Sequence, residues 1–109
     1  MPQIVLASQS TSRRRLLEGA GITPHVMVSH VDEETDFFNA MSPADMVIAL
    51  AVTKAHTVRE QVDFPAIIIG CDSTFDVDGV SFGKPGTPEI AKERALAISG
   101  RSGLLHTGH

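Results

Sequence analysis

The sequence predicts an α/β fold in which helices flank a mixed, twisted sheet. Short apolar runs with strand character alternate with segments of helical periodicity along the whole chain. Of its 109 residues, 42% are hydrophobic and 20% are charged, an ordinary globular balance. The length suffices for one small domain.

The first elements are a strand, a loop and a helix. Gln3–Ala7 is a short apolar run, and the hydroxyl-rich residues 8–12 follow it. An Arg- and Leu-rich segment then ends at Gly19-Ala20-Gly21, a plausible helix C-cap. Residues 25–29 are expected to form a second strand.

A strong helix start follows at residues 42–45. Ser42 is suited to be the N-cap, Pro43 occupies the first helical position and Asp45 supplies an acid in the first turn. The elements then expected are a helix over residues 42–62, a buried strand at 66–69, a hairpin with strands 73–77 and 80–82 around Asp78-Gly79, and a helix from Thr87 to about Ser99.

The last residues, 104–109, have the character of a strand that is just beginning. No polar tail precedes the end of the chain. We therefore expect residues 1–109 to be a single partial domain of a longer protein, with the C-terminal portion absent.

Composition excludes several classes of function. The net charge of -4 and the absence of Trp and Tyr argue against a nucleic-acid polymer as partner. The single cysteine, Cys71, cannot form an internal disulfide, which suits a reducing compartment. Neither a signal peptide nor an apolar run of membrane-spanning length is visible. The expected location is the cytoplasm, without membrane association.

Lys54 is the most informative anomaly. The apolar face of its helix comprises Val47, Leu50, Ala51, Ala55, Val58 and Val62, and Lys54 lies on that face. A lysine there either extends its amine to solvent or meets an anion. Those readings are about equally plausible from the residues alone.

Asp72 is the second anomaly, because it directly follows an apolar strand. In open α/β sheets ligands gather at the carboxyl ends of strands, where a carboxylate often holds a divalent metal or positions water. A turn or capping role is the simpler alternative. Residues 32–34 offer further carboxylates, although a run of acids is more often a solvated loop.

The first loop predicts an anion site. Ser8 and Ser10 lie between a strand and a helix N-terminus, and Arg13, Arg14 and Arg15 follow. Backbone amides, the helix dipole and guanidinium groups favour phosphate there, although at least one arginine is expected merely to solvate the helix. Lys84, between Gly83 and Pro85, is a weaker candidate.

Six short segments also resemble, in order, the motifs of one family. The set resembles the Maf family of nucleoside triphosphate pyrophosphatases, with its Maf/ITPase-like fold, and covers the whole chain. The matching segments are residues 6–17, 32–33, 54–55, 69–73, 82–85 and 99–108, which resemble LASxSPRRxxLL, a short acidic motif, KA, IGADT, LGKP and SGRTHxVYTG.

The resemblance implies hydrolysis of non-canonical or pyrimidine nucleoside triphosphates to monophosphate and pyrophosphate, with Mg²⁺ or Mn²⁺ as cofactor. It also leaves a homodimer open. By carry-over Glu33 and Asp72 bind the metal and activate water, with Asp72 as the first choice of base and Lys54 as a catalytic charge. The substrate-binding residues are Ser8, Ser10, Arg13 and Lys84.

Some positions depart from the family pattern. Thr11 and Ser12 replace a Pro and an Arg, which removes one guanidinium, while Gly103 and His106 replace a His and a Tyr. The family's later IQG segment is not in the chain. Two other functions stay open: a non-catalytic nucleotide-binding module linked to septum formation and cell division, and a phosphatase that releases inorganic phosphate.

Overall fold

The computed structural model describes residues 2–82 and 87–109. It confirms the α/β class, with both parallel and antiparallel strand pairing. The elements in chain order are β1 (Gln3–Ala7), α1 (Thr11–Gly19), β2 (His25–Val26), α2 (Asp36–Asn39), α3 (Pro43–Arg59), β3 (Ala66–Gly70), β4 (Asp72–Val77), β5 (Val80–Phe82), α4 (Pro88–Ile98) and β6 (Leu104–Gly108).

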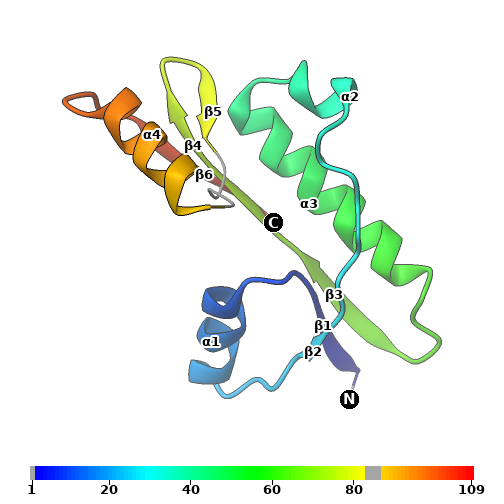
Figure 1. The fold of residues 1–109 in the computed structure, drawn as a ribbon. Coiled ribbons are helices and arrows are strands. Elements are labelled where there is room, and N and C mark those ends of the chain that lie inside the picture. Colours follow the sequence, from blue (N-terminus) through cyan, green and yellow to red (C-terminus); the bar gives the residue numbers. More distant parts are fainter. Residues whose placement is uncertain (1, 83–86) are drawn as a thin grey trace.

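The strands form two three-stranded sheets. The first is parallel, in the order β2-β1-β3, and the second is antiparallel, in the order β5-β4-β6. Only Cys71 separates β3 from β4, so the chain runs almost straight from one sheet into the other (Figure 1). The carboxyl ends of β1 and β3 therefore lie where β4 begins.

Helix α3 is the element that unites the two sheets. It contacts β3 of the parallel sheet and both β4 and β6 of the antiparallel sheet. Its buried residues Val47, Leu50, Ala51 and Val58 belong to the predicted apolar face. A cluster of the fully buried Val5, Ala7 and Val58 forms the core between β1 and α3.

Local signals placed most elements correctly. Ser42 caps α3 by accepting a hydrogen bond from the Asp45 amide, and Thr87 caps α4 in the same way. The hairpin turns at Asp78 and Gly79, which both have positive φ, as its sequence predicts.

Other boundaries differ from the prediction. The second strand comprises only His25–Val26, because only these residues have a strand partner, in β1. Helix α3 ends at Arg59 and not near residue 62. Helix α2 was not anticipated, although Thr35 caps it.

Within the described parts of the chain, no helix is both long and apolar enough to cross a bilayer.

Candidate functional site

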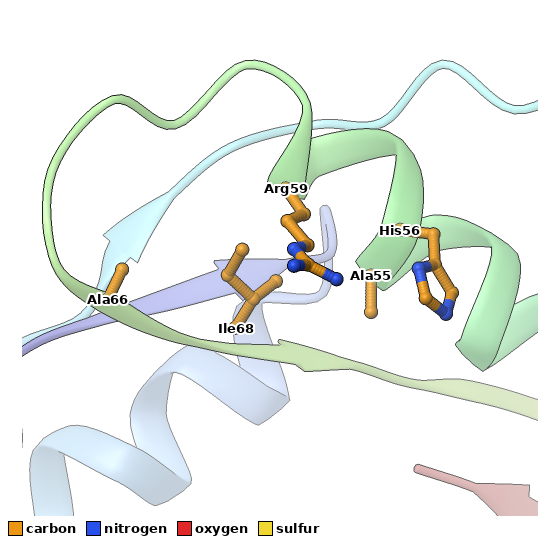
Figure 2. Close-up of a pocket in the computed structure, with 5 residues that line it drawn as sticks. All are labelled: Ala55, His56, Arg59, Ala66 and Ile68. Atoms are coloured by element: carbon orange, nitrogen blue, oxygen red, sulfur yellow. The ribbon is translucent and has the colours of Figure 1, made fainter.

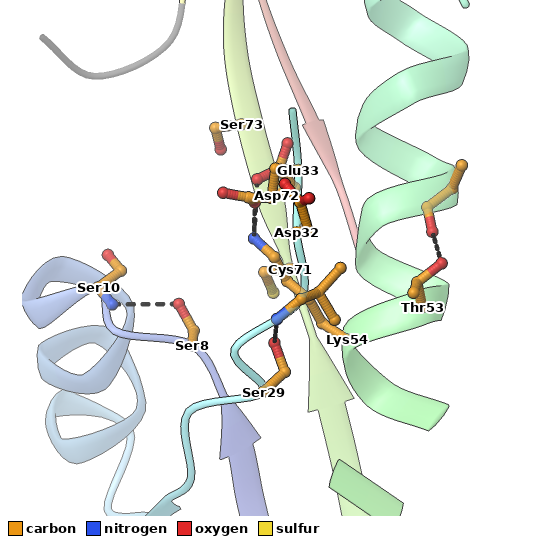
Figure 3. Close-up of polar contacts among 12 residues, drawn as sticks. Ser8, Ser10, Ser29, Asp32, Glu33, Thr53, Lys54, Cys71, Asp72 and Ser73 are labelled. Carbon is orange, nitrogen blue, oxygen red and sulfur yellow. Dashed lines mark hydrogen bonds and ion pairs between the residues drawn. The ribbon is translucent and has the colours of Figure 1, made fainter. Parts of the chain in front are cut away.

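Lys54 lies between two carboxylates. Its Nζ is 2.6 Å from Glu33 Oε1 and 3.0 Å from Asp72 Oδ1. The Lys54 and Asp72 side chains are 16% and 14% exposed, whereas that of Glu33 is 44% exposed. Three residues that are distant in the sequence thus come together: Lys54 from helix α3, Asp72 from the start of β4 and Glu33 from the loop before α2 (Figure 3). This cluster is half-sheltered and open on the Glu33 side.

The electrostatics of the cluster are unbalanced, since one ammonium serves two carboxylates. Burial raises the pKa of Asp72, and the charge of Glu33 adds to this, against the opposing effects of Lys54 and Arg13. Burial by itself lowers the pKa of Lys54, but the hydrogen bonds and charges of Glu33 and Asp72 outweigh it and leave that pKa raised. Lys54 is therefore firmly cationic, while Asp72 is more basic than an ordinary aspartate.

Arg13 approaches the same place from α1. Its Nη1 donates to Ser8 Oγ at 3.1 Å and to the Cys71 carbonyl at 3.4 Å, and its Nη2 donates to Ser73 Oγ at 2.8 Å. All three acceptors are neutral. Among the described residues no carboxylate forms an ion pair with Arg13, so its charge is available to an anionic ligand.

Ser8 and Ser10 both have structural contacts in the first loop. The nearly buried Ser8 accepts hydrogen bonds from the Ser10 amide and from Arg13. Ser10 is the N-cap of α1 and accepts from the Arg13 amide at 3.3 Å. The two hydroxyls thus shape the turn that presents Arg13, and direct substrate contact by either stays a prediction.

The remaining charged residues of these loops diverge from the cluster. Arg14 pairs with Glu18 one helical turn later, and Arg15 is exposed. Asp32 accepts a hydrogen bond from the Glu34 amide, a turn contact at the surface. Arg13 is the only one of the arginines at residues 13–15 that joins the site. Glu33 is the only one of the acids at residues 32–34 that does so. Lys84 lies outside the described residues.

The donor atoms suit a hard divalent cation. Glu33 and Asp72 both contact the Lys54 ammonium and so lie near each other, and carboxylate oxygen is what Mg²⁺ and Mn²⁺ prefer. Within residues 2–82 and 87–109 no group of three or more His, Cys, Asp or Glu could hold a metal. A cation here would therefore need further oxygen ligands from substrate phosphates and water, as is common for Mg²⁺.

Two contacts of Arg13 and one of Ser73 were not foreseen from the sequence. Ser73 and the Cys71 carbonyl flank Asp72, and their position beside a candidate residue was the only available signal. Ser73 Oγ also lies 2.9 Å from Thr107 Oγ1. Nothing local to Thr107 indicates this, because it depends on the register in which β4 pairs with β6.

Two surface cavities lie apart from the cluster. One, of about 270 Å³, lies between α3 and β3 and is lined by Ala55, His56, Arg59, Ala66 and Ile68 (Figure 2). The other, of about 250 Å³, is lined by Gln3, His25, Phe64 and Pro65. Neither contains a carboxylate, so the Lys54 cluster and not a cavity is the better candidate for metal-assisted chemistry.

Comparison with known proteins gives a consistent family match. The Maf-like protein family model matches residues 3–109. A relative from Streptomyces coelicolor, named nucleoside triphosphate pyrophosphatase, is 47% identical over 108 residues, which are 98% of this chain and 52% of the relative. A protein of that name from Prochlorococcus marinus is 46% identical over 97% of this chain and 56% of its own length.

A third protein of the same name, from Thermosynechococcus vestitus, is 42% identical over all of this chain and 54% of its own length. The chain thus spans about half the length of the curated relatives that it matches.

Proposed function

Since the chain belongs to the Maf-like family, we propose that the complete protein is a nucleoside triphosphate pyrophosphatase. It hydrolyses a nucleoside triphosphate, of non-canonical or pyrimidine type, to the monophosphate and pyrophosphate. The name of the relatives supports the reaction. The observation in this chain that best supports the reaction is that Arg13 and the Glu33–Lys54–Asp72 cluster lie together at the junction of the two sheets.

The two cations have complementary roles. Arg13 carries a charge with no carboxylate partner among the described residues and holds the phosphates. Lys54 has three N–H donors, of which Glu33 and Asp72 take two, and the third is left to stabilise charge that develops on the phosphate in the transition state. Phosphoryl transfer needs mainly positioning and charge stabilisation, so these fixed cations supply most of what the reaction requires from the protein. Ser8 and Ser10 shape the loop, and Lys84 is a further phosphate-binding candidate.

Asp72 acts as the general base. Its raised pKa makes it a stronger proton acceptor than an ordinary aspartate, and Lys54 orients the carboxylate. It takes a proton from the attacking water while the water oxygen bonds to phosphorus and pyrophosphate leaves. Glu33 and Asp72 would hold Mg²⁺ or Mn²⁺, which when bound supplies charge neutralisation to the phosphates.

The test is pyrophosphate release by the complete protein with a panel of nucleoside triphosphates and Mg²⁺. Asp72→Asn is expected to lower kcat by about 10²–10⁴-fold, the usual contribution of a general base. Asp63→Asn is the matched control, because Asp63 is exposed and precedes β3, whereas Asp72 follows that strand. Normal turnover by Asp72→Asn would contradict the assignment of the base.

Measurements of nucleotide binding and of inorganic phosphate release, made beside this assay, decide between the proposal and its alternatives. Nucleotide binding without pyrophosphate release by the complete protein would favour a regulatory module linked to septum formation and cell division. Release of inorganic phosphate would indicate a phosphatase.

We further propose a cytoplasmic enzyme, with a homodimer as the oligomer to be tested by light scattering.

A further inference from the structure

We propose that Ser73 and Thr107 form a hydroxyl relay that positions the Arg13 guanidinium for phosphate, with Thr107 as a positioning residue. The inference rests on the proposed function, in which Arg13 holds the phosphates. It assigns a role to β6, an element that contributes no residue to the carboxylate cluster described above.

The relay is continuous from α1 to β6. Arg13 Nη2 donates to Ser73 Oγ at 2.8 Å, and Ser73 Oγ lies 2.9 Å from Thr107 Oγ1. Ser73 and Thr107 are direct partners in the antiparallel pairing of β4 with β6, so their side chains lie on the same face of the sheet. The second hydroxyl therefore reaches Ser73 from a rigid element and not from a loop.

The chemistry of the side chains fixes the direction of the first hydrogen bond in the relay. Arginine is a donor only, so Ser73 Oγ must accept from Arg13. Either hydroxyl could donate in the contact between Ser73 and Thr107. When Ser73 donates to Thr107, its oxygen becomes more electron-rich and holds Arg13 more strongly, since linked hydrogen bonds polarise one another. Thr107 thus limits both the rotamer of Ser73 and the direction of the guanidinium.

Neutral partners are what a phosphate-binding arginine requires. A carboxylate would fix Arg13 equally well but would compete with phosphate for its charge. The hydroxyls of Ser8 and Ser73 and the Cys71 carbonyl fix the guanidinium without an ion pair, and among the described residues the charge of Asp72 acts on it only beyond ion-pair distance. Asp72 lies between Cys71 and Ser73 in the chain, so the backbone that positions Arg13 also positions the proposed base.

The experiment measures the affinity of the complete protein for inorganic pyrophosphate by calorimetry. Thr107→Val removes the hydroxyl at constant shape and is expected to weaken binding about three- to tenfold, the loss of one neutral hydrogen bond. Thr107→Ser should restore it. Thr57→Val is the matched control, because among the described residues Thr57 donates only to its own helix, at the Thr53 carbonyl.

A double-mutant cycle separates positioning from a general structural effect. In an Arg13→Ala background Thr107→Val should cause no further loss of affinity, because Ser73 and Thr107 then have no guanidinium to position. Thermal unfolding of each variant verifies the fold. If Thr107→Val does not fold, Ser73→Ala takes its place in the cycle.

Each outcome bears on one proposal. Wild-type affinity in Thr107→Val, an equal loss in the Arg13→Ala background, or no pyrophosphate binding by the wild-type protein would overturn the relay. Weaker binding by Thr107→Val, together with no pyrophosphate release from nucleotides by the wild-type protein, would support the relay and reject the proposed reaction.

Discussion

At the scale of single residues, the site depends on a lysine that the sequence places on an apolar helical face. Because a buried amine needs an anion, the position of Lys54 made a carboxylate or phosphate partner a reasonable expectation. The structure supplies two carboxylates, Glu33 and Asp72. Asp72 was a candidate from its place after an apolar strand, whereas the choice of Glu33 followed only from family resemblance, since residues 32–34 are equivalent to one another as a charge run.

The raised pKa of Asp72 predicts a pH-dependent cost to stability. A carboxyl group whose pKa is higher in the folded than in the unfolded state favours folding when protonated. Its contribution is present below the unfolded value of about 3.8 and is lost as the pH rises through the folded value. Charged Asp72 is therefore expected to destabilise the fold at neutral pH, as functional carboxylates often do.

Urea unfolding of the wild-type protein and of Asp72→Asn between about pH 3 and pH 7 tests this. The free energy of unfolding of Asp72→Asn should rise relative to that of the wild-type protein as the pH increases. Asp63→Asn, measured in parallel, controls for the removal of an exposed carboxylate. A difference that is constant with pH would show that pairing with Lys54 cancels the effect of burial, and a shift in favour of the wild type would show that pairing dominates.

At the scale of elements, local sequence determines the helices well and the sheets less well. The caps of α3 and α4 and the turn at Gly79 are short-range signals that act within a few residues. The division into a parallel and an antiparallel sheet depends on distant pairings, such as β4 with β6. For the same reason the contact of Ser73 with Thr107 lay beyond the reach of sequence reasoning.

The close approach of α3 to both sheets gives a prediction for Gly70. A Cβ at this position would overlap the Ala51 carbonyl oxygen and lie 3.0 Å from the Ala55 Cβ. Gly70→Ala is therefore expected to lower the free energy of unfolding by about 1–3 kcal/mol or more, since helix backbone must shift. Gly108 meets the Val47 backbone in the same way on the second sheet.

Gly19→Ala is the matched control, because a Cβ at Gly19 would meet nothing within 4 Å. In the last turn of α1 it should be neutral or stabilise by up to about 1 kcal/mol. Urea unfolding measures both variants. Equal stability of Gly70→Ala and the wild-type protein would mean that α3 does not pack against β3 as closely as the structure has it.

At the scale of the whole molecule, the candidate site lies where the two sheets meet. Helix α1 follows the first strand of the parallel sheet, β4 belongs to the antiparallel sheet, and α3 crosses both. Arg13, Asp72 and Lys54 come from these three elements. An anion bound among them would therefore link parts of the fold that are otherwise joined by α3 and by the short passage through Cys71.

This arrangement predicts that pyrophosphate stabilises the complete protein through Arg13. A ligand at 100 times its Kd adds about 2.7 kcal/mol to the free energy of unfolding if it binds only the folded state. The added stability should be lost in Arg13→Ala and retained in Arg59→Ala, since Arg59 lines the cavity between α3 and β3. Thermal unfolding with increasing pyrophosphate measures this. The opposite pattern, with the effect lost only in Arg59→Ala, would place the anion in that cavity, away from the junction of the sheets.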